Sequence, residues 1–283
     1  MKNFTFLALQ GSDGTVAELA PIADRTRDVG GRLNVMHLGA VPILSAAMTA
    51  HPYGIPALPE DWVTKRNAMA EKLLAQQAAT REFLRDQGLG GEVGTLCVEP
   101  AAFHDLVALH GLFADISIVA DSVRKDEISF DNVVYGLLFE APGPVILNSA
   151  KNPKALAPEN VMLGWDNSLP AARAVRAALP ILKAAKDVTI ACIDPDASRF
   201  ADGENPGADL ATWLSHHGCH VTVQEYSSGH HRVGETLLAR AKEHGADLVV
   251  MGAYGHRRWN ERFFGGTTET MIKQTDVPVL LTH

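Results

Sequence analysis

Short apolar runs alternate along the chain with longer stretches whose apolar residues recur at helical spacing. The runs are apolar on both faces, which is typical of strands buried under helices on both sides of a sheet. Alternating strands and helices of this kind predict parallel β-α-β units and therefore an α/β fold. In the second half of the chain the expected strands are Val161–Trp165, Val188–Ile193, His220–Glu225, Leu248–Gly252 and Val279–Thr282.

Helix signals fall between these strands. Pro170 suits a first helical turn, where its missing N–H is not needed. Gly218 and Gly245 are typical helix stops. The expected helices are Leu169–Ala185, Ala208–His217, Gly234–His244 and Thr267–Gln274.

The first half of the chain follows the same order. The helices Gly14–Val29 and Asp61–Gln87 and the Pro/Gly-rich loop His51–Glu60 separate its expected strands. The N-terminal segment is read as the first strand and not as a secretory signal, because it has no small-residue cleavage site. The strands are Phe4–Leu9, Arg32–Leu38, Glu92–Val98, Ile116–Ala120 and Val145–Asn148.

Segments of the first half resemble segments of the second, which indicates two copies of one unit. The most similar pair, Ala114–Ala120 and Ala246–Gly252, reads ADISIVA and ADLVVMG and lies 132 residues apart. The other pairs are Gly143–Asn148 with Val277–Thr282 and Phe4–Ser12 with Asn160–Ser168. We therefore expect two doubly wound domains in tandem, each with a five-stranded parallel sheet, in residues 1–150 and 155–283. The segment Ser149–Pro158 has the composition of a linker.

Composition places the chain among ordinary globular proteins. It has 283 residues, of which 46% are hydrophobic, and a formal net charge of −8. The negative charge disfavours binding to nucleic acid or to anionic membranes, which attract positive surfaces. No apolar run reaches the roughly 18 residues of a transmembrane helix. Three widely spaced cysteines indicate reduced thiols, so we expect a cytoplasmic protein with no nucleic-acid or membrane partner.

The stretch after the fourth strand of the second copy carries the strongest functional signal. The strand ends at Gly252, Gly255 follows after two residues, and Gly265 follows after nine more. Ligands of open parallel sheets bind beyond the carboxyl ends of strands, and glycines there let the backbone approach a phosphate without a Cβ in the way. The triplet Gly266–Thr268 then opens a helix, whose free N–H groups and positive dipole end attract an anion.

Polar side chains of the same stretch strengthen the anion-binding interpretation. The hydroxyls of Thr267 and Thr268 are additional donors, and His256 and three arginines place positive charge nearby in an otherwise acidic protein. Each feature is common by itself, and the combination is more specific. The stretch is neither a Walker A loop, which needs Gly-Lys-Ser/Thr, nor a dinucleotide fingerprint.

This stretch resembles the C-terminal signature of the universal stress protein family, whose ATP-binding members carry Gly-X2-Gly-X9-Gly-Ser/Thr. The opening of the second copy, VMLGWDNS at Val161–Ser168, also resembles the first strand of that family. The resemblance covers most of the second copy and, more loosely, the first. The whole chain therefore resembles a tandem, two-domain universal stress protein.

The resemblance implies a fold and a ligand. The fold is two Rossmann-like domains of the adenine nucleotide alpha hydrolase-like type, and the second domain is implied to bind ATP. Mg²⁺ is expected with the triphosphate, because bare phosphates in an acidic protein are costly. The implied contact of Asp166 is the ribose or adenine. With His256 included, the expected nucleotide-binding residues are Asp166, Gly252, Gly255, His256, Gly265, Gly266, Thr267 and Thr268.

Two residues of this set have an alternative interpretation. Gly266 stands where the family usually has Ser or Thr, so the hydroxyl is lost unless Thr267 or Thr268 replaces it. Asp166 could instead cap the following helix, which is a common role for Asp in a turn.

The resemblance implies a nucleotide-dependent stress-response or regulatory module. The phosphate loop offers no general base, so any ATP hydrolysis is expected to be slow. One alternative is an interaction scaffold of the same fold that binds no nucleotide. Another is an enzyme of the wider adenine-nucleotide-binding group, such as an adenylating enzyme.

The final strands of the two copies suggest an assembly. Single-domain members of the family resemble two-fold dimers that pair their final strands. Val145–Asn148 and Val279–Thr282 are both apolar and both follow a proline, and natural proteins avoid unpaired edges of this kind. We expect these strands to pair within the chain, as an intramolecular pseudo-dimer of the two domains, with a homodimer of the whole chain as a further option.

The first copy departs from the nucleotide-binding pattern. Its fourth strand ends at Ala120 with no Gly-X-X-Gly, and Gln10–Gly11–Ser12 replaces the Trp-Asp-Asn of the second copy. Four acidic residues, Asp121, Asp126, Glu127 and Asp131, make the equivalent loop repel phosphate. We expect this copy to be degenerate for ATP; the alternative is a different, less anionic ligand.

Other polar residues are expected to have structural roles. The cluster His216, His217, Cys219 and His220 lies at a predicted helix end, where histidine favours the dipole, and lacks the usual zinc spacing. Asp194 is read as a turn residue and Trp165 as core or cleft wall. No metal site and no catalytic constellation is predicted.

Overall fold

The computed structural model describes residues 3–44, 58–152, 154–195, 207–253 and 266–283. The chain divides into two compact units, Lys2–Pro142 and Gly143–His283. Each unit is an α/β structure with a mostly parallel sheet, as the alternation of strands and helices predicted. The strand Val145–Leu147, which the sequence assigned to the first copy, lies in the second unit.

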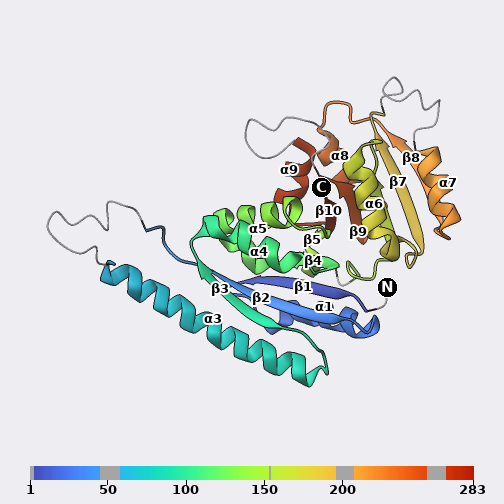
Figure 1. The fold of residues 1–283 in the computed structure, drawn as a ribbon. Helices are drawn as coiled ribbons and strands as arrows, with labels where there is room; N and C mark the ends of the chain where they lie inside the picture. The colour runs from blue at the N-terminus through green and yellow to red at the C-terminus, as the bar shows by residue number, and fades with distance from the viewer. Residues whose placement is uncertain (1–2, 45–57, 153, 196–206, 254–265) are drawn as a thin grey trace. The chain divides into compact units, whose positions relative to one another are not determined.

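The sheet of the first unit has the strand order β3-β2-β1-β4 (Figure 1). Its strand pairs are parallel, and Phe6 of β1 lies opposite both Leu33 and Ile116. The strands are β1 Thr5–Gly11, β2 Arg32–Ala40, β3 Val93–Val98 and β4 Ile116–Val119.

Helices cover both faces of these strands. Helix α3 lies on one side of the strands and the pair α4 and α5 on the other (Figure 1). The helices are α1 Val16–Asp28, α3 Glu60–Asp86, α4 Phe103–Gly111 and α5 Glu127–Phe139, with 3-10 turns at Pro100–Ala102 (η1) and Asp121–Lys125 (η2).

The acidic stretch after β4 is not a loop, and that expectation was wrong. Asp121 opens η2, Asp126 is the N-cap of α5, and Glu127 and Asp131 lie within α5. Acidic residues in a first helical turn are stabilised by the positive end of the helix dipole. For Asp121 and Glu127, which lie in first turns, the helix dipole therefore explains the acidic side chain apart from any effect on a ligand.

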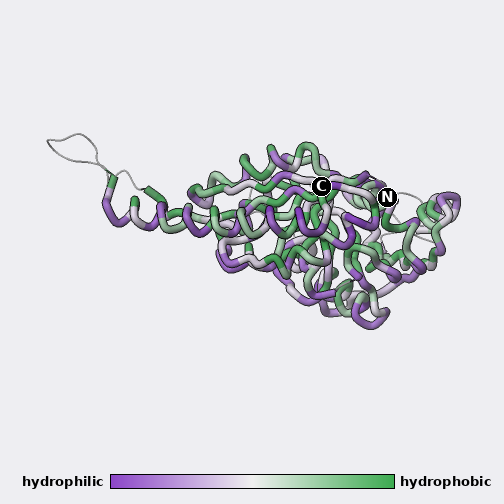
Figure 2. The backbone as a smooth tube through the Cα atoms, turned by 90° about the horizontal axis from the view of Figure 1, so that it is seen from below, coloured by the Kyte–Doolittle hydropathy of each residue, from purple (hydrophilic) through white to green (hydrophobic). Residues whose placement is uncertain are grey.

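Helix α3 is long and mostly solvent-exposed. Figure 2 shows hydrophilic and hydrophobic turns alternating along it. Its buried residues are Leu73, Thr80 and Leu84. Thr80 Oγ1 lies 3.0 Å from Nε2 of His37 on β2, so a buried polar contact joins the helix to the sheet.

The sheet of the second unit has the order β5-β10-β9-β6-β7-β8. Its neighbouring strands are parallel except for β5 and β10. The strands are β5 Val145–Leu147, β6 Asn160–Gly164, β7 Asp187–Ile193, β8 Val221–Tyr226, β9 Leu248–Gly252 and β10 Val279–Thr282.

The helices of the second unit end where the glycines predicted. Gly218 and Gly245 have φ of +85° and +60°, a left-handed conformation that stops a helix at little cost for glycine. Helix α6 packs on β9 and β10, and α8 packs on α9. The helices are α6 Leu169–Leu182, α7 Ala208–His216, α8 Val233–Glu243 and α9 Gly266–Lys273.

Strands β5 and β10 pair antiparallel, with Val279 opposite Leu147. The expected pairing of these two final strands is confirmed, and the packing of two domains about it stays a prediction. Asn148 follows β5 with φ of +60°, and its Nδ2 donates to the carbonyls of Gln274 and Val277 at 3.0 and 3.1 Å. These bonds fix the end of β5 beside the segment that leads into β10.

The segment after β5 is more ordered than a free linker. A 3-10 turn, η3, spans Ser149–Lys151, and the side chains of Ala155 and Leu156 are buried. In the part of the chain that the structure describes, no helix combines the length and apolar character needed to cross a membrane.

Candidate functional site

The candidate site of the second unit lies at the carboxyl edge of its sheet. Strands β6, β7 and β8 follow one another in one direction, whereas β9 and β10 lie on the other side of β6. The carboxyl ends of β6 and β9 therefore form the topological switch point, where open α/β sheets bind their ligands. The residues that the sequence singled out follow these two strands.

Asp166 lies just beyond β6 and is solvent-exposed. Its Oδ1 accepts a hydrogen bond from the backbone N–H of Ser168 at 3.1 Å, and Asn167 between them has φ of +54°. Ser168 is the N-cap of α6, because its Oγ accepts from the N–H of Ala171 at 3.2 Å. Asp166 therefore shapes the turn, while the capping role considered for it belongs to Ser168.

Gly252 ends β9 against the first turn of α6. A Cβ at this position would lie 2.4 Å from both the carbonyl carbon of Pro170 and the backbone nitrogen of Ala171. Real Cβ atoms do not approach backbone so closely. The structure thus gives a packing reason for glycine here, which sequence reasoning had attributed to the approach of a phosphate.

The first turn of α9 begins with Gly266, which is exposed, followed by the partly buried Thr267 and the buried Thr268. No atom of the described residues lies within 4 Å of a Cβ placed on Gly266. Helix α8 supports this turn, since a Cβ on Gly234 would lie 2.9 Å from Cβ of Thr270 and 3.2 Å from the carbonyl oxygen of Thr267. Close packing therefore holds the helix start in place.

The remaining predicted residues lie outside the part of the chain that the structure describes. They are Gly255, His256 and Gly265, and the arginines of the same stretch, Arg257, Arg258 and Arg262, also lie there.

Two buried polar atoms near this edge have no hydrogen-bond partner among the described residues. They are Nε1 of Trp165, which directly follows β6, and Oγ1 of Thr282, which lies opposite Gly252 in the β9–β10 pair. Buried donors are normally satisfied, so unpaired ones next to a switch point are candidates for contact with a ligand or water. Sequence reasoning missed Thr282, because a threonine in a strand carries no functional signal.

Asp194 directly follows β7 and contacts Ser228, which lies two residues beyond the end of β8. Its Oδ1 accepts from the N–H of Ser228 at 3.0 Å, and Oδ2 accepts from the hydroxyl of the same residue. These hydrogen bonds hold the pKa of Asp194 below its usual value. The residue has φ of +47°, so its interpretation as a turn residue is confirmed.

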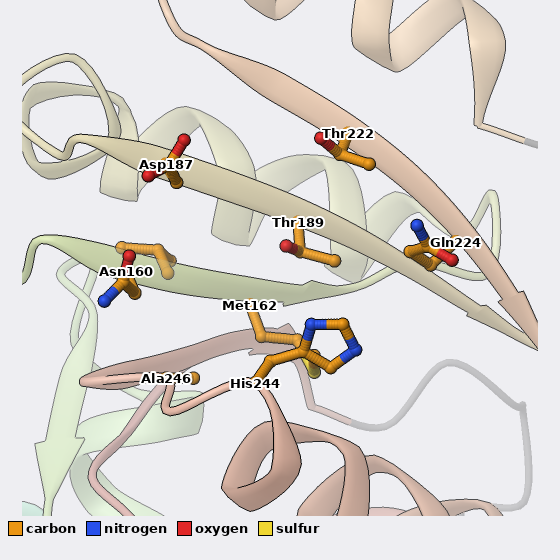
Figure 3. A pocket seen from close by; sticks show the side chains of 9 residues that line it. Asn160, Met162, Asp187, Thr189, Thr222, Gln224, His244 and Ala246 are labelled. Atoms are coloured by element: carbon orange, nitrogen blue, oxygen red, sulfur yellow. The ribbon is translucent and has the colours of Figure 1, made fainter.

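A polar hollow of about 270 Å³ lies at the other end of the second unit's sheet. Thr189, Thr222 and Gln224 project into it from neighbouring strands, and His244 approaches from the end of α8 (Figure 3). Asn160 and Asp187 of its lining open β6 and β7. None of the predicted nucleotide-binding residues that the structure describes lines this hollow.

The histidines of the described residues mostly contact single partners. His220 Nδ1 lies 2.7 Å from Asp187 Oδ1, and the ring of His217 packs on Trp213. One group of metal-ligating type, His104 with Asp105 and Glu140, is present among the described residues. Both ring nitrogens of His104 lie 3.2 Å from these carboxylates, so direct contacts among the three side chains account for the group.

The thiols are poor candidates for nucleophiles. All three cysteines are free. Burial, with a smaller effect of Glu225, raises the pKa of Cys192 to about 11. Burial also raises the pKa of Cys97 and Cys219. A thiol with a raised pKa carries little of the reactive thiolate at neutral pH.

Comparison with family models found a similarity in the second half of the chain. Residues 158–283 match the model of the universal stress protein family. A comparison with curated proteins gave no match.

Solved structures match the fold over the whole chain. A universal stress protein from Archaeoglobus fulgidus DSM 4304 is 17% identical, with a TM-score of 0.62 over 98% of this chain and 97% of that chain. A functionally unknown protein from Pseudomonas aeruginosa PAO1 is 14% identical, with a TM-score of 0.55 over 99% and 92% of the two chains. A putative universal stress protein from Pseudomonas aeruginosa UCBPP-PA14 is also 14% identical, with a TM-score of 0.54 over 99% and 93%. At these identities the likeness concerns the fold alone.

Proposed function

We propose that the chain is a tandem universal stress protein whose second half binds ATP and acts as a nucleotide-dependent regulatory module. The observation that carries the proposal is the start of α9, where Gly266, Thr267 and Thr268 form a helix N-terminus after the glycine-spaced stretch. The N–H groups and the positive dipole end of a helix start attract phosphate. The family match over residues 158–283 supports the same assignment.

Asp166 supplies the second contact in this proposal. Its carboxylate is exposed at the end of β6, and one of its oxygens shapes the local turn. A carboxylate in this place accepts hydrogen bonds from ribose hydroxyls, which are donors. Mg²⁺ would accompany the triphosphate and neutralise part of its charge. The cysteine count supports a reducing, cytoplasmic setting.

The test is calorimetric titration of the full chain with ATP and Mg²⁺, comparing wild type with Asp166→Asn. Asparagine keeps the Oδ1 acceptor for Ser168 and tolerates the turn, so the fold is retained, while the charged acceptor for ribose is lost. We expect one site in the wild type and an affinity about tenfold lower in the variant, because hydrogen bonds to charged groups contribute about 1.5–3 kcal/mol.

The matched control is Asp187→Asn, which changes a carboxylate at the amino end of the same sheet. Its ATP affinity should equal that of the wild type. Absence of ATP binding to the wild-type chain, or equal affinity in Asp166→Asn and the wild type, would contradict the proposal.

A further inference from the structure

The switch point of the first unit is occupied by a side chain of the protein itself. This unit has the strand order β3-β2-β1-β4, so its ligand crevice would open at the carboxyl ends of β1 and β4. The carboxylate of Glu18, in the first turn of α1, lies there. Its Oε2 accepts from Nε2 of Gln10 at 3.0 Å and from Oγ of Ser122 at 2.8 Å.

The partners of Glu18 come from the two strands that flank the crevice. Gln10 is a completely buried residue near the end of β1, and Ser122 is a buried residue of η2, directly after β4. Ser122 Oγ in turn accepts from the backbone N–H of Gly11 at 3.1 Å. An amide, a hydroxyl and a backbone N–H are donors of the kind that bind an anion. Here the amide of Gln10 and the hydroxyl of Ser122 donate to the carboxylate of Glu18, and the N–H of Gly11 donates to that hydroxyl.

Backbone packing closes the same place. A Cβ on Gly11 would lie 2.3 Å from the carbonyl oxygen of Ser122. In the strand registers Phe6 lies opposite Ile116, and Val161 lies opposite Leu248 at the matching position of the second unit. Counting from these pairs, Gly11 corresponds to Asp166. Where the second unit exposes a carboxylate, the first unit has a glycine with no room for any side chain.

The charges around Glu18 are also compensated within the protein. Lys72 and Lys125 both pair with Asp13, and Lys125 Nζ lies 3.1 Å from its carboxylate. Hydrogen bonds from Lys72 and then Lys125 hold the pKa of Asp13 below its usual value. Oε1 of Gln10 and of Gln76 are buried acceptors without a donor among the described residues. An anion that entered the crevice would therefore face acceptor oxygens, which repel it, and lysines whose charge Asp13 already neutralises.

We propose that the Glu18 carboxylate is a built-in anionic ligand, which fills the crevice of the first unit and excludes phosphate ligands from it. If the second half binds ATP as proposed above, each chain then has one nucleotide site. The occupancy of the first crevice by Glu18 does not depend on that proposed function.

The test is rescue of Glu18→Ala by formate in the full-length chain. Removing the carboxylate leaves Ser122 Oγ without its acceptor and Gln10 Nε2 with only one of its two, the carbonyl oxygen of Thr15 at 2.8 Å, and it opens a space of carboxylate size. We expect the Tm to fall by about 5 °C and millimolar formate to restore at least half of the loss, at constant ionic strength. Wild type and Glu82→Ala, an exposed glutamate of α3, should not respond to formate. Equal Tm values for Glu18→Ala and wild type, or equal formate effects on both, would overturn the proposal.

Glu18→Gln covers the case in which the alanine variant does not fold. Glutamine keeps the shape and one acceptor oxygen but loses the charge. We expect a Tm below that of the wild type and no response to formate, since the space stays filled. A Tm equal to that of the wild type would show that the charge has no part, and would overturn the proposal. Neither measurement uses ATP, so a failure of nucleotide binding in the second half is distinguishable from a failure here.

Discussion

The carboxylate of Asp247 accepts a hydrogen bond from the backbone N–H of Asn160, at 3.0 Å, and so ties the start of β9 to the start of β6. The first unit contains the same bond, from Thr5 N–H to Asp115 at 2.8 Å. In both units the aspartate follows an alanine directly before the fourth strand of the repeat. The repeated Ala-Asp pair is therefore a structural anchor between two strands.

Asp247 has further partners that Asp115 lacks among the described residues. The N–H of Glu159 and Nδ2 of Asn152 donate to it at 2.9 and 3.1 Å. Burial acts to raise the pKa of Asp247, but these hydrogen bonds and that from Asn160 hold it below its usual value. A lowered pKa in the folded state means that its contribution is present near neutral pH and is lost as the pH falls through the acidic range.

Asp247→Asn should lower the free energy of unfolding by about 2–3 kcal/mol. The carboxylate accepts hydrogen bonds from three donors, whereas the amide replaces one of its two acceptor oxygens with an NH₂ donor. Urea denaturation at neutral pH measures the loss. Asp115→Asn is the matched control and should cost about half as much. Equal losses in the two variants would contradict the assignment of the additional bonds to Asp247.

The sequence predicted the strands well because buried parallel strands are short apolar runs with clear ends. It did not assign α4 and α5. Helix α5 is buried at Phe130, Val133, Val134, Leu137 and Leu138, and the apolar Ile128 stands exposed among the polar residues of its other face, so the separation of apolar and polar positions that marks a helix in a sequence is weak. The run Val145–Leu147 was recognised as a strand, but its place in the second unit depends on pairing with β10.

The candidate site was only partly predictable, since spacing along the chain does not report contacts across it. Gly252 was singled out for a phosphate, and its closest neighbours are Pro170 and Ala171, far away in sequence. The role of Glu18 could not be read from the sequence either. It depends on Gln10 and Ser122, which the fold brings together from different elements.

Gly252→Ala should destabilise the chain by about 1–3 kcal/mol, because the added methyl would overlap the backbone at the start of α6. Urea denaturation is the measurement. Gly266→Ala is the control, since its Cβ would meet no atom of the described residues within 4 Å, and its stability should stay close to that of the wild type. If Gly252→Ala were as stable as the control, the packing explanation for this glycine would fail.

Gly266→Ser should strengthen ATP binding by roughly threefold to tenfold, the worth of one additional hydrogen bond of about 0.5–1.5 kcal/mol. The substitution restores the hydroxyl that the resembled family usually carries, at a helix start where no described atom lies within 4 Å of the new Cβ. Calorimetric titration measures the change. Gly90→Ser, another exposed glycine with free space around its Cβ, is the control and should leave the affinity unchanged. Weaker binding in Gly266→Ser than in the wild type would argue against a phosphate at this helix start.

His37 should make the stability of the chain depend on pH. The side chain is 1% exposed, and burial lowers its pKa to about 4. Its Nε2 contacts Thr80, and Nδ1 has no partner among the described residues, so a proton added to the ring would be poorly stabilised. In the unfolded chain the pKa is about 6.5, so the unfolded state takes up a proton first.

The contribution of neutral His37 to the free energy of unfolding is therefore fully present above about pH 6.5. The free energy of unfolding should fall by about 3 kcal/mol as the pH drops from about 6.5 to about 4, since each pKa unit corresponds to about 1.4 kcal/mol. Denaturation at a series of pH values measures the slope. His37→Gln removes the titrating group and keeps a hydrogen-bonding side chain, so its stability should lose this dependence even if its value at neutral pH is lower. His110→Gln, which removes an exposed histidine of α4, should keep the slope of the wild type. A wild-type slope in His37→Gln would mean that other groups cause the acid sensitivity.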